Sequence, residues 1–219
     1  MKAHTLRELA MARTQTARTK TRSVVSSRDR IREAAKRLFA ERGYEGTSTA
    51  EICNLAGTSQ SQLVKHFVDK QGLLDAVFEH AWEQINPTLH LATEAISEPR
   101  ERLRVVTEIM FNVLVKDREL RTIFLLEGRR IRGDGHMVVL VPGYLEFVKV
   151  LDAILNEMAE RGELQTGIHP AALRSGLMGV FEALLRDQLL SSTSKFPASY
   201  NDNDIRRLFY TFLASCMAK

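Results

Sequence analysis

Apolar residues recur along most of this chain with the spacing of an α-helix that is buried on one side. Between Ile31 and Phe39 they fall at positions i, i+3, i+4, i+7 and i+8, which is one face of a helix. The same spacing returns in later segments. The pattern predicts an all-α protein with about nine helices in total.

Residues that favour helix ends mark where the first helices begin and stop. Ser26, Ser48 and Ser59 each precede an acidic or amide residue by three positions, which is the spacing of an N-terminal cap. Gly43 and Gly57 fit helix ends, because glycine tolerates the positive φ found there. The two short helices after Ser48 and Ser59 are therefore joined by a tight glycine turn, as in a helix-turn-helix.

The remainder of the chain is also predicted to be helical. A fourth helix begins after Asp69 and should break at Asn86-Pro87, because proline cannot donate a backbone hydrogen bond. Further helices are expected from Pro99, around 120–127, over 144–158, over 170–190 and over 204–217. The apolar stretch 137–141 has no evident pairing partner, so we interpret it as the start of a helix rather than as a strand.

Positive charge is concentrated near the N-terminus. The net charge is +5 over residues 1–27, +2 over 28–72 and −3 over 73–219, so a polyanion such as DNA would favour the N-terminal end. We expect residues 1–27 to form a disordered basic arm that reaches a DNA minor groove, with a solubilising tail or an expression leader as the alternative. The arm residues suited to that groove are Arg13, Arg18, Lys20 and Arg22.

Several classes of protein are disfavoured. No apolar run is long enough for a membrane span, and Cys53 and Cys216 lack metal-ligand spacing, which is typical of reduced thiols in a cytoplasmic protein. None of the six histidines forms a Glu-x-x-His or His-x-x-x-His pair, and no nucleophile elbow, phosphate-binding loop or dinucleotide fingerprint is present. We therefore expect no enzymatic activity, no cofactor and no metal.

Residues 28–82 resemble the N-terminal domain of the TetR (tetracycline-repressor-like) family of regulators. The resemblance rests on the segment 34–77, AAKRLFAERGYEGTSTAEICNLAGTSQSQLVKHFVDKQGLLDAV, in which a helix stop, a cap, a turn and a His-Phe ending occur in register. It implies a three-helix helix-turn-helix DNA-binding domain at 28–72 and a larger helical ligand-binding and dimerisation domain at 73–219.

The resemblance also implies a homodimer, with the helices 170–190 and 204–217 pairing across its twofold axis. Gly176 and Gly179 on the first of these helices would permit close backbone approach, either between subunits or within one.

The second short helix is expected to enter the major groove of duplex operator DNA. The residues predicted to contact DNA are Thr47, Ser48, Thr58, Ser59, Gln60, Ser61, Gln62, Lys65, His66 and Lys70. Gln60 and Gln62 carry the amide groups that suit adenine, and the phosphate contacts are assigned to Thr47, Ser48, His66 and Lys70. Relatives commonly have two tyrosines where this chain has Val64 and Lys65, so the operator contacts should differ there.

A ligand pocket needs apolar walls with a few polar groups. The residues predicted to line it are Met110, Leu114, Phe124, Tyr144, Phe147, Val148 and Phe181, with Glu127, Arg129 and His136 as candidates for a polar anchor. Each of them also suits an ordinary helical core or a solvated loop. As a set, the wall residues favour a hydrophobic or aromatic ligand.

These observations predict a ligand-responsive transcriptional repressor. It would bind palindromic operator DNA as a homodimer and be released by a small hydrophobic or aromatic inducer. The alternatives are a ligand-independent DNA-binding or nucleoid-associated factor on the same fold, and a transcriptional activator.

Overall fold

The computed structural model describes residues 26–127 and 141–218, and these residues form nine α-helices. They are α2 (Ser27–Arg42), α3 (Thr49–Ala56), α4 (Gln60–Phe67), α5 (Lys70–Glu94), α6 (Pro99–Lys116), α7 (Arg118–Leu126), α8 (Pro142–Glu160), α9 (Pro170–Thr193) and α10 (Asp202–Ser215). The all-α prediction is confirmed. The predicted arm (up to residue 25), Arg129, His136 and most of the stretch 137–141 lie outside the described residues.

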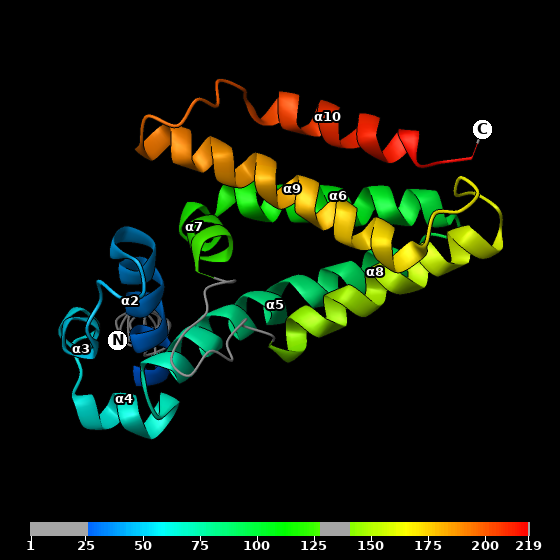
Figure 1. Ribbon diagram of the computed structural model, residues 1–219. Coiled ribbons are helices and arrows are strands. Elements are labelled where there is room, and N and C mark those ends of the chain that lie inside the picture. The colour runs from blue at the N-terminus through cyan, green and yellow to red at the C-terminus, as the bar shows by residue number, and fades with distance from the viewer. Residues whose placement is uncertain (1–25, 128–140, 219) are drawn as a thin grey trace, which may run out of the picture.

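The helices form a small group and a larger one. Figure 1 shows α2, α3 and α4 together at the N-terminal end of α5, while α6, α8, α9 and α10 lie along one another farther away. α5 runs from the first group into the second, and α7 lies between them. No helix in the described ranges has the length and hydropathy needed to cross a bilayer.

The predicted helix caps are present. Ser26 accepts a hydrogen bond from the backbone N–H of Asp29 (3.0 Å), and Ser48 forms a reciprocal capping box with Glu51. Gly57 ends α3 in the left-handed conformation, at φ 61° and ψ 47°. These local signals fix the entry of the chain into α2 and α3 and the turn before α4.

The predicted break of the fourth helix at Asn86-Pro87 is wrong, because α5 continues through Pro87. Pro87 is exposed, whereas Ile85 and Leu89 on either side of it are buried. Apolar burial on both sides therefore outweighs the one backbone hydrogen bond that proline cannot make. The buried Asn86 side chain also donates to the carbonyl oxygen of Gly143 (3.0 Å), which ties α5 to the start of α8.

A polar network holds α10 against α6. The carboxylate of Glu108 accepts a hydrogen bond from the Tyr210 hydroxyl (2.6 Å) and forms an ion pair with Arg206. Partial burial by itself would raise the pKa of Glu108, but the hydrogen bonds from Tyr210 and Arg206 and the nearby positive charge outweigh it. The pKa of Glu108 is consequently held below its ordinary value.

We expect Tyr210→Phe to lower the free energy of unfolding by about 1–2 kcal/mol near neutral pH, because Glu108 loses a donor. Since the folded-state pKa of Glu108 is lowered, its stabilisation is present above the unfolded pKa and is lost as the pH falls through the folded value. The deficit should therefore shrink as the pH falls through the folded-state pKa, which urea titrations over a series of acidic pH values would follow. Tyr200→Phe is the control, because the Tyr200 hydroxyl donates to a carbonyl oxygen, that of Leu184 (2.9 Å). A Tyr210→Phe deficit that is constant with pH would contradict this assignment.

Candidate DNA-binding surface and ligand cavity

A small apolar core fixes the angle between α3 and α4. Ile52, Leu63 and Phe67 are buried in it, together with Cys53, which is 3% exposed. Burial raises the pKa of the Cys53 thiol, so this residue is a packed core thiol rather than a reactive one. The opposite sides of α3 and α4 are left facing solvent.

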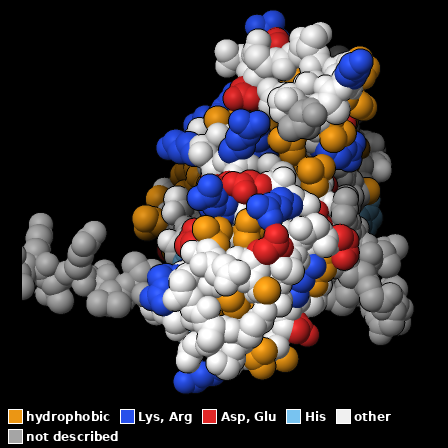
Figure 2. Space-filling view, turned by 90° about the vertical axis from the view of Figure 1, so that its left-hand side faces the viewer, with side chains coloured by type: hydrophobic (Ala, Val, Ile, Leu, Met, Phe, Trp, Pro, Cys, Tyr) orange, Lys and Arg blue, Asp and Glu red, His pale blue; other side chains and the backbone are white. Residues whose placement is uncertain are grey.

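Most residues predicted to contact DNA lie on that solvent-facing side. The exposed ones are Ser48, Ser59, Gln60, Ser61 and Lys65, and the partly exposed ones are Thr58, Gln62, His66 and Lys70. Figure 2 looks onto this end of the molecule, whose lower part is mostly uncharged, with Lys and Arg side chains toward its edges and isolated hydrophobic side chains between them. Contact of these residues with DNA stays a prediction.

The position of Thr47 counts against a side-chain contact with phosphate. Thr47 is 2% exposed, and its hydroxyl lies within hydrogen-bond distance of the carbonyl oxygens of Leu38 (3.2 Å) and Gly43 (2.9 Å). Its backbone N–H donates to the carbonyl oxygen of Tyr44 (3.3 Å). The turn between α2 and α3 uses these groups to satisfy its own backbone, whereas the neighbouring Ser48 is exposed.

Contacts within the domain orient several of the remaining side chains. His66 Nε2 lies 3.0 Å from the Ser27 hydroxyl oxygen, and the Lys70 ammonium lies 4.2 Å from the centroid of the Tyr44 ring. The Gln60 side-chain amide donates to the hydroxyl oxygen of Thr49 on α3 (3.2 Å). These contacts favour one orientation of each side chain on this surface.

The larger group of helices surrounds a partly open apolar cavity of about 140 Å³, which is lined by residues of α5, α6, α7, α8, α9 and α10. All six residues of the predicted ligand-binding set lie in its wall: Met110, Leu114, Phe124, Tyr144, Phe147 and Phe181. Val148 does not line the cavity, although the pattern placed it there. Contact of the six with a ligand stays a prediction, but they line one cavity.

Trp82 stands at the centre of the aromatic wall. Its ring centroid lies 5.0 Å from that of Phe147 in a stacked arrangement, 5.6 Å from that of Phe124 and 5.8 Å from that of Tyr144. Trp82 is the only tryptophan of the chain. An aromatic enclosure of this kind suits apolar or planar groups and offers little to a sugar or a nucleotide.

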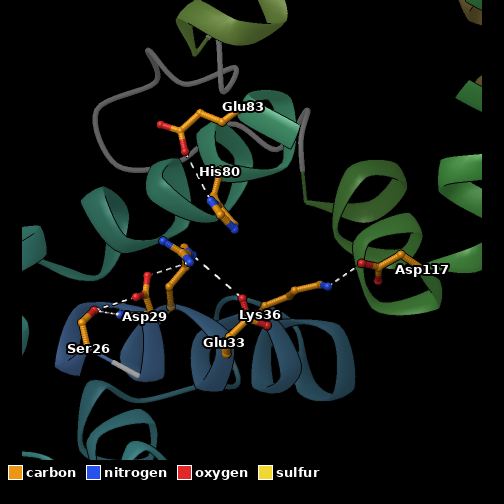
Figure 3. Close-up of polar contacts among 8 residues, drawn as sticks. Ser26, Asp29, Glu33, Lys36, His80, Glu83 and Asp117 are labelled. Atoms are coloured by element: carbon orange, nitrogen blue, oxygen red, sulfur yellow. Dashed lines mark hydrogen bonds and ion pairs between the residues drawn. The ribbon is translucent and has the colours of Figure 1, made fainter. Parts of the chain in front are cut away.

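α7 lies between the cavity and the DNA-binding domain. It carries Phe124 of the cavity wall, and both of its ends contact the region of α2. At its N-terminal cap, the carboxylate of Asp117 lies 2.5 Å from the ammonium of Lys36, as Figure 3 shows. At its C-terminal cap, the carboxylate of Glu127 accepts a hydrogen bond from the backbone N–H of Tyr44 (3.2 Å).

Comparison with known proteins decides the identity of this fold. Residues 31–77 match the family model described as "Bacterial regulatory proteins, tetR family". The N-terminal part of the chain that contains α3 and α4 is therefore similar to the DNA-binding domain of the TetR family. The proteins that the chain matches are transcriptional regulators.

The relatives of the chain include a regulator of fatty acid metabolism. It is 25% identical over 154 residues to the fatty acid metabolism regulator protein of Bacillus subtilis (strain 168), which covers 69% of this chain and 78% of that protein. Two solved structures share its fold. FadR from Bacillus subtilis in complex with stearoyl-CoA has a TM-score of 0.71 at 21% identity, covering 82% of this chain and 96% of that one. AibR in complex with isovaleryl coenzyme A and operator DNA has a TM-score of 0.62 at 22% identity, covering 82% and 94%.

Sequence reasoning missed part of the wall and misplaced Glu127. The unpredicted wall residues include Phe78, Trp82, Thr107, Met178 and Glu182. Phe78 and Trp82 were visible as an apolar stripe of the fourth helix, but periodicity does not tell which neighbour a stripe faces. Glu127, a candidate ligand anchor, is 3% exposed, does not line the cavity and bonds to Tyr44 instead.

Proposed function

We propose that this protein is a transcriptional repressor that binds operator DNA as a homodimer and is released by a small apolar acyl group, carried as a coenzyme A thioester. The observation that carries the proposal is the aromatic-lined cavity, whose wall includes residues of both helices that lead to the DNA-binding domain, α5 and α7. Structural relatives bound to stearoyl-CoA and to isovaleryl coenzyme A support the ligand class.

The size of the cavity favours a short or branched acyl group. Its volume of about 140 Å³ is close to that of engineered apolar cavities of roughly 150 Å³, which stay dry and bind benzene. A long extended chain would fill this space and have to continue through the open part of the cavity. We therefore rank an acyl group of isovaleryl size ahead of a stearoyl chain for this conformation.

Release follows from a shift between conformations. A dimer must hold its two α4 helices about 34–36 Å apart to reach successive major grooves. Phe78 and Trp82 on α5 and Phe124 on α7 line the cavity, so a ligand that wedges against them favours conformations with another spacing. The operator affinity then falls by the ratio of the ligand's affinities for the two conformations.

The outward face of α9 and α10 supports the homodimer. Gly179 is exposed, and a Cβ atom built there meets no atom within 4 Å. Leu208 on α10 is 52% exposed. Gly176, by contrast, faces its own subunit, because a Cβ there would lie 3.7 Å from the Phe212 ring. Exposed small and apolar groups on α9 and α10 suit close packing against a second copy.

Tryptophan fluorescence tests the ligand directly. Because Trp82 is the only tryptophan and lies in the wall, titration with isovaleryl-CoA should change its emission over the same concentrations that release a labelled operator. Coenzyme A without an acyl group should do neither, and stearoyl-CoA should act more weakly. Full operator affinity at saturating concentrations of both thioesters would refute the proposed ligand class.

Filling the cavity should give a repressor that no longer responds. In Met178→Trp the larger ring occupies part of the space, so operator binding is kept while release needs at least about tenfold more isovaleryl-CoA. Val148→Trp is the matched control, because Val148 is partly exposed on α8 and does not line the cavity. Equal ligand response in the two variants would place the ligand elsewhere.

A further inference from the structure

The exposed face of α4 holds one apolar side chain among polar ones. Gln60, Ser61 and Lys65 are exposed on this face, and Val64 is 55% exposed between them. Residues four apart lie one above the other on a helix, so Val64 stands one turn beyond Gln60 on the same face. The buried side of the helix is made by other residues, of which Leu63 is 1% exposed.

Exposure alone says little about Val64, since single apolar residues are common on protein surfaces. Its place is more informative. Val64 lies in the middle of the helix proposed to enter the major groove, so DNA binding would remove water from its two methyl groups. Set against a polar base edge, those methyl groups would displace water from donors and acceptors without replacing its hydrogen bonds.

The major groove offers one apolar partner, the 5-methyl group of thymine. Contact between this methyl group and the valine methyl groups buries apolar surface on both sides and leaves no polar group unpaired. We propose that Val64 reads the 5-methyl group of a thymine in each operator half-site. This inference rests on the proposed binding of operator DNA by α4 and adds a specificity-determining residue to it.

The test begins with selection of an operator from a library of random duplexes by the full-length protein. Each thymine of the enriched site is then replaced by deoxyuridine, which lacks only the 5-methyl group. We expect one position in each half-site at which this replacement weakens wild-type binding about fourfold, the effect of one buried methyl group.

The variant Val64→Ser should bind the thymine operator more weakly and be indifferent to deoxyuridine at that position. Leu55→Ser is the matched control, because Leu55 is an apolar residue of α3, 48% exposed, outside the face of α4. It should keep the wild-type response to deoxyuridine. Unchanged circular dichroism and melting temperature in both variants would show that the domain still folds.

Each result separates the inference from the proposed function. An enriched site at which wild-type binding ignores every thymine methyl group, or at which Val64→Ser stays sensitive to deoxyuridine, overturns the role of Val64 and leaves operator binding intact. Failure to enrich any sequence overturns the proposed function itself, and the role of Val64 with it.

Discussion

The substitution Gly179→Arg is expected to convert the protein into a monomer and to weaken operator binding at least about a hundredfold. A single subunit presents one α4 helix, so the gain in affinity from engaging two half-sites at once is lost, and that gain commonly reaches 10²–10⁴. The subunit itself should tolerate the change. A Cβ at Gly179 meets no atom within 4 Å, and arginine is a better helix former than glycine, which lies roughly 0.8–1 kcal/mol below alanine.

Only the dimer should be disrupted by Gly179→Arg, because a twofold interface would bury two arginines without partners against each other. Light scattering after size exclusion gives the mass, and a gel-shift titration gives the operator affinity. Ala153→Arg is the matched control, since it adds the same charge at an exposed position of α8. If the Gly179→Arg protein remains dimeric, the dimer interface does not include this face of α9.

Features that depend on neighbours in the sequence could be predicted from it. The caps at Ser26 and Ser48 and the left-handed Gly57 rest on contacts within three or four residues, so the residue types at those positions were sufficient. The helical period likewise placed Met110 and Phe181 on inward faces, and both line the cavity. Propensity and period act locally, and they were reliable where nothing distant opposed them.

Features that depend on residues far apart in the sequence could not be predicted from it. The sequence predicted a helix end at Asn86-Pro87, but α5 continues through Pro87 because Ile85 and Leu89 are buried on either side of it. Thr47 was predicted to contact phosphate, but its hydroxyl donates to the carbonyl oxygen of Gly43 in the turn after α2. The hydrogen bond between Tyr44 and Glu127 joins residues 83 positions apart, and no pattern near either residue announces it. Tertiary burial and backbone satisfaction override local signals at such positions.

The double variant Lys36→Met/Glu127→Met is expected to bind both ligand and operator while the two events lose their coupling. These substitutions remove the ion pair and the hydrogen bond that join the ends of α7 to the region of α2. Effectors typically change the affinity at a second site by 5–150-fold. In the double variant, isovaleryl-CoA should lower operator affinity by less than about threefold, because α7 can respond to the ligand without moving α2.

Two variants control for the chemistry of these changes. Arg37→Met removes a positive charge from the neighbouring position of α2, where Arg37 pairs with Glu41 of the same helix (2.9 Å), so coupling should be retained. Glu127→Gln keeps an oxygen that can accept from the Tyr44 N–H, so it should retain more coupling than Glu127→Met. A merely structural role for Glu127 would lower the melting temperature without separating these two variants in ligand response.

Reciprocity supplies an independent measurement of the same coupling. If isovaleryl-CoA weakens operator binding by some factor, operator DNA must weaken isovaleryl-CoA binding by that factor. Titrations followed by Trp82 fluorescence, with and without operator, should therefore differ for the wild type and coincide for the double variant. If the double variant keeps the wild-type difference, the ion pair and the hydrogen bond do not carry the coupling, which then passes through α5 or through the packing of α7 against α2.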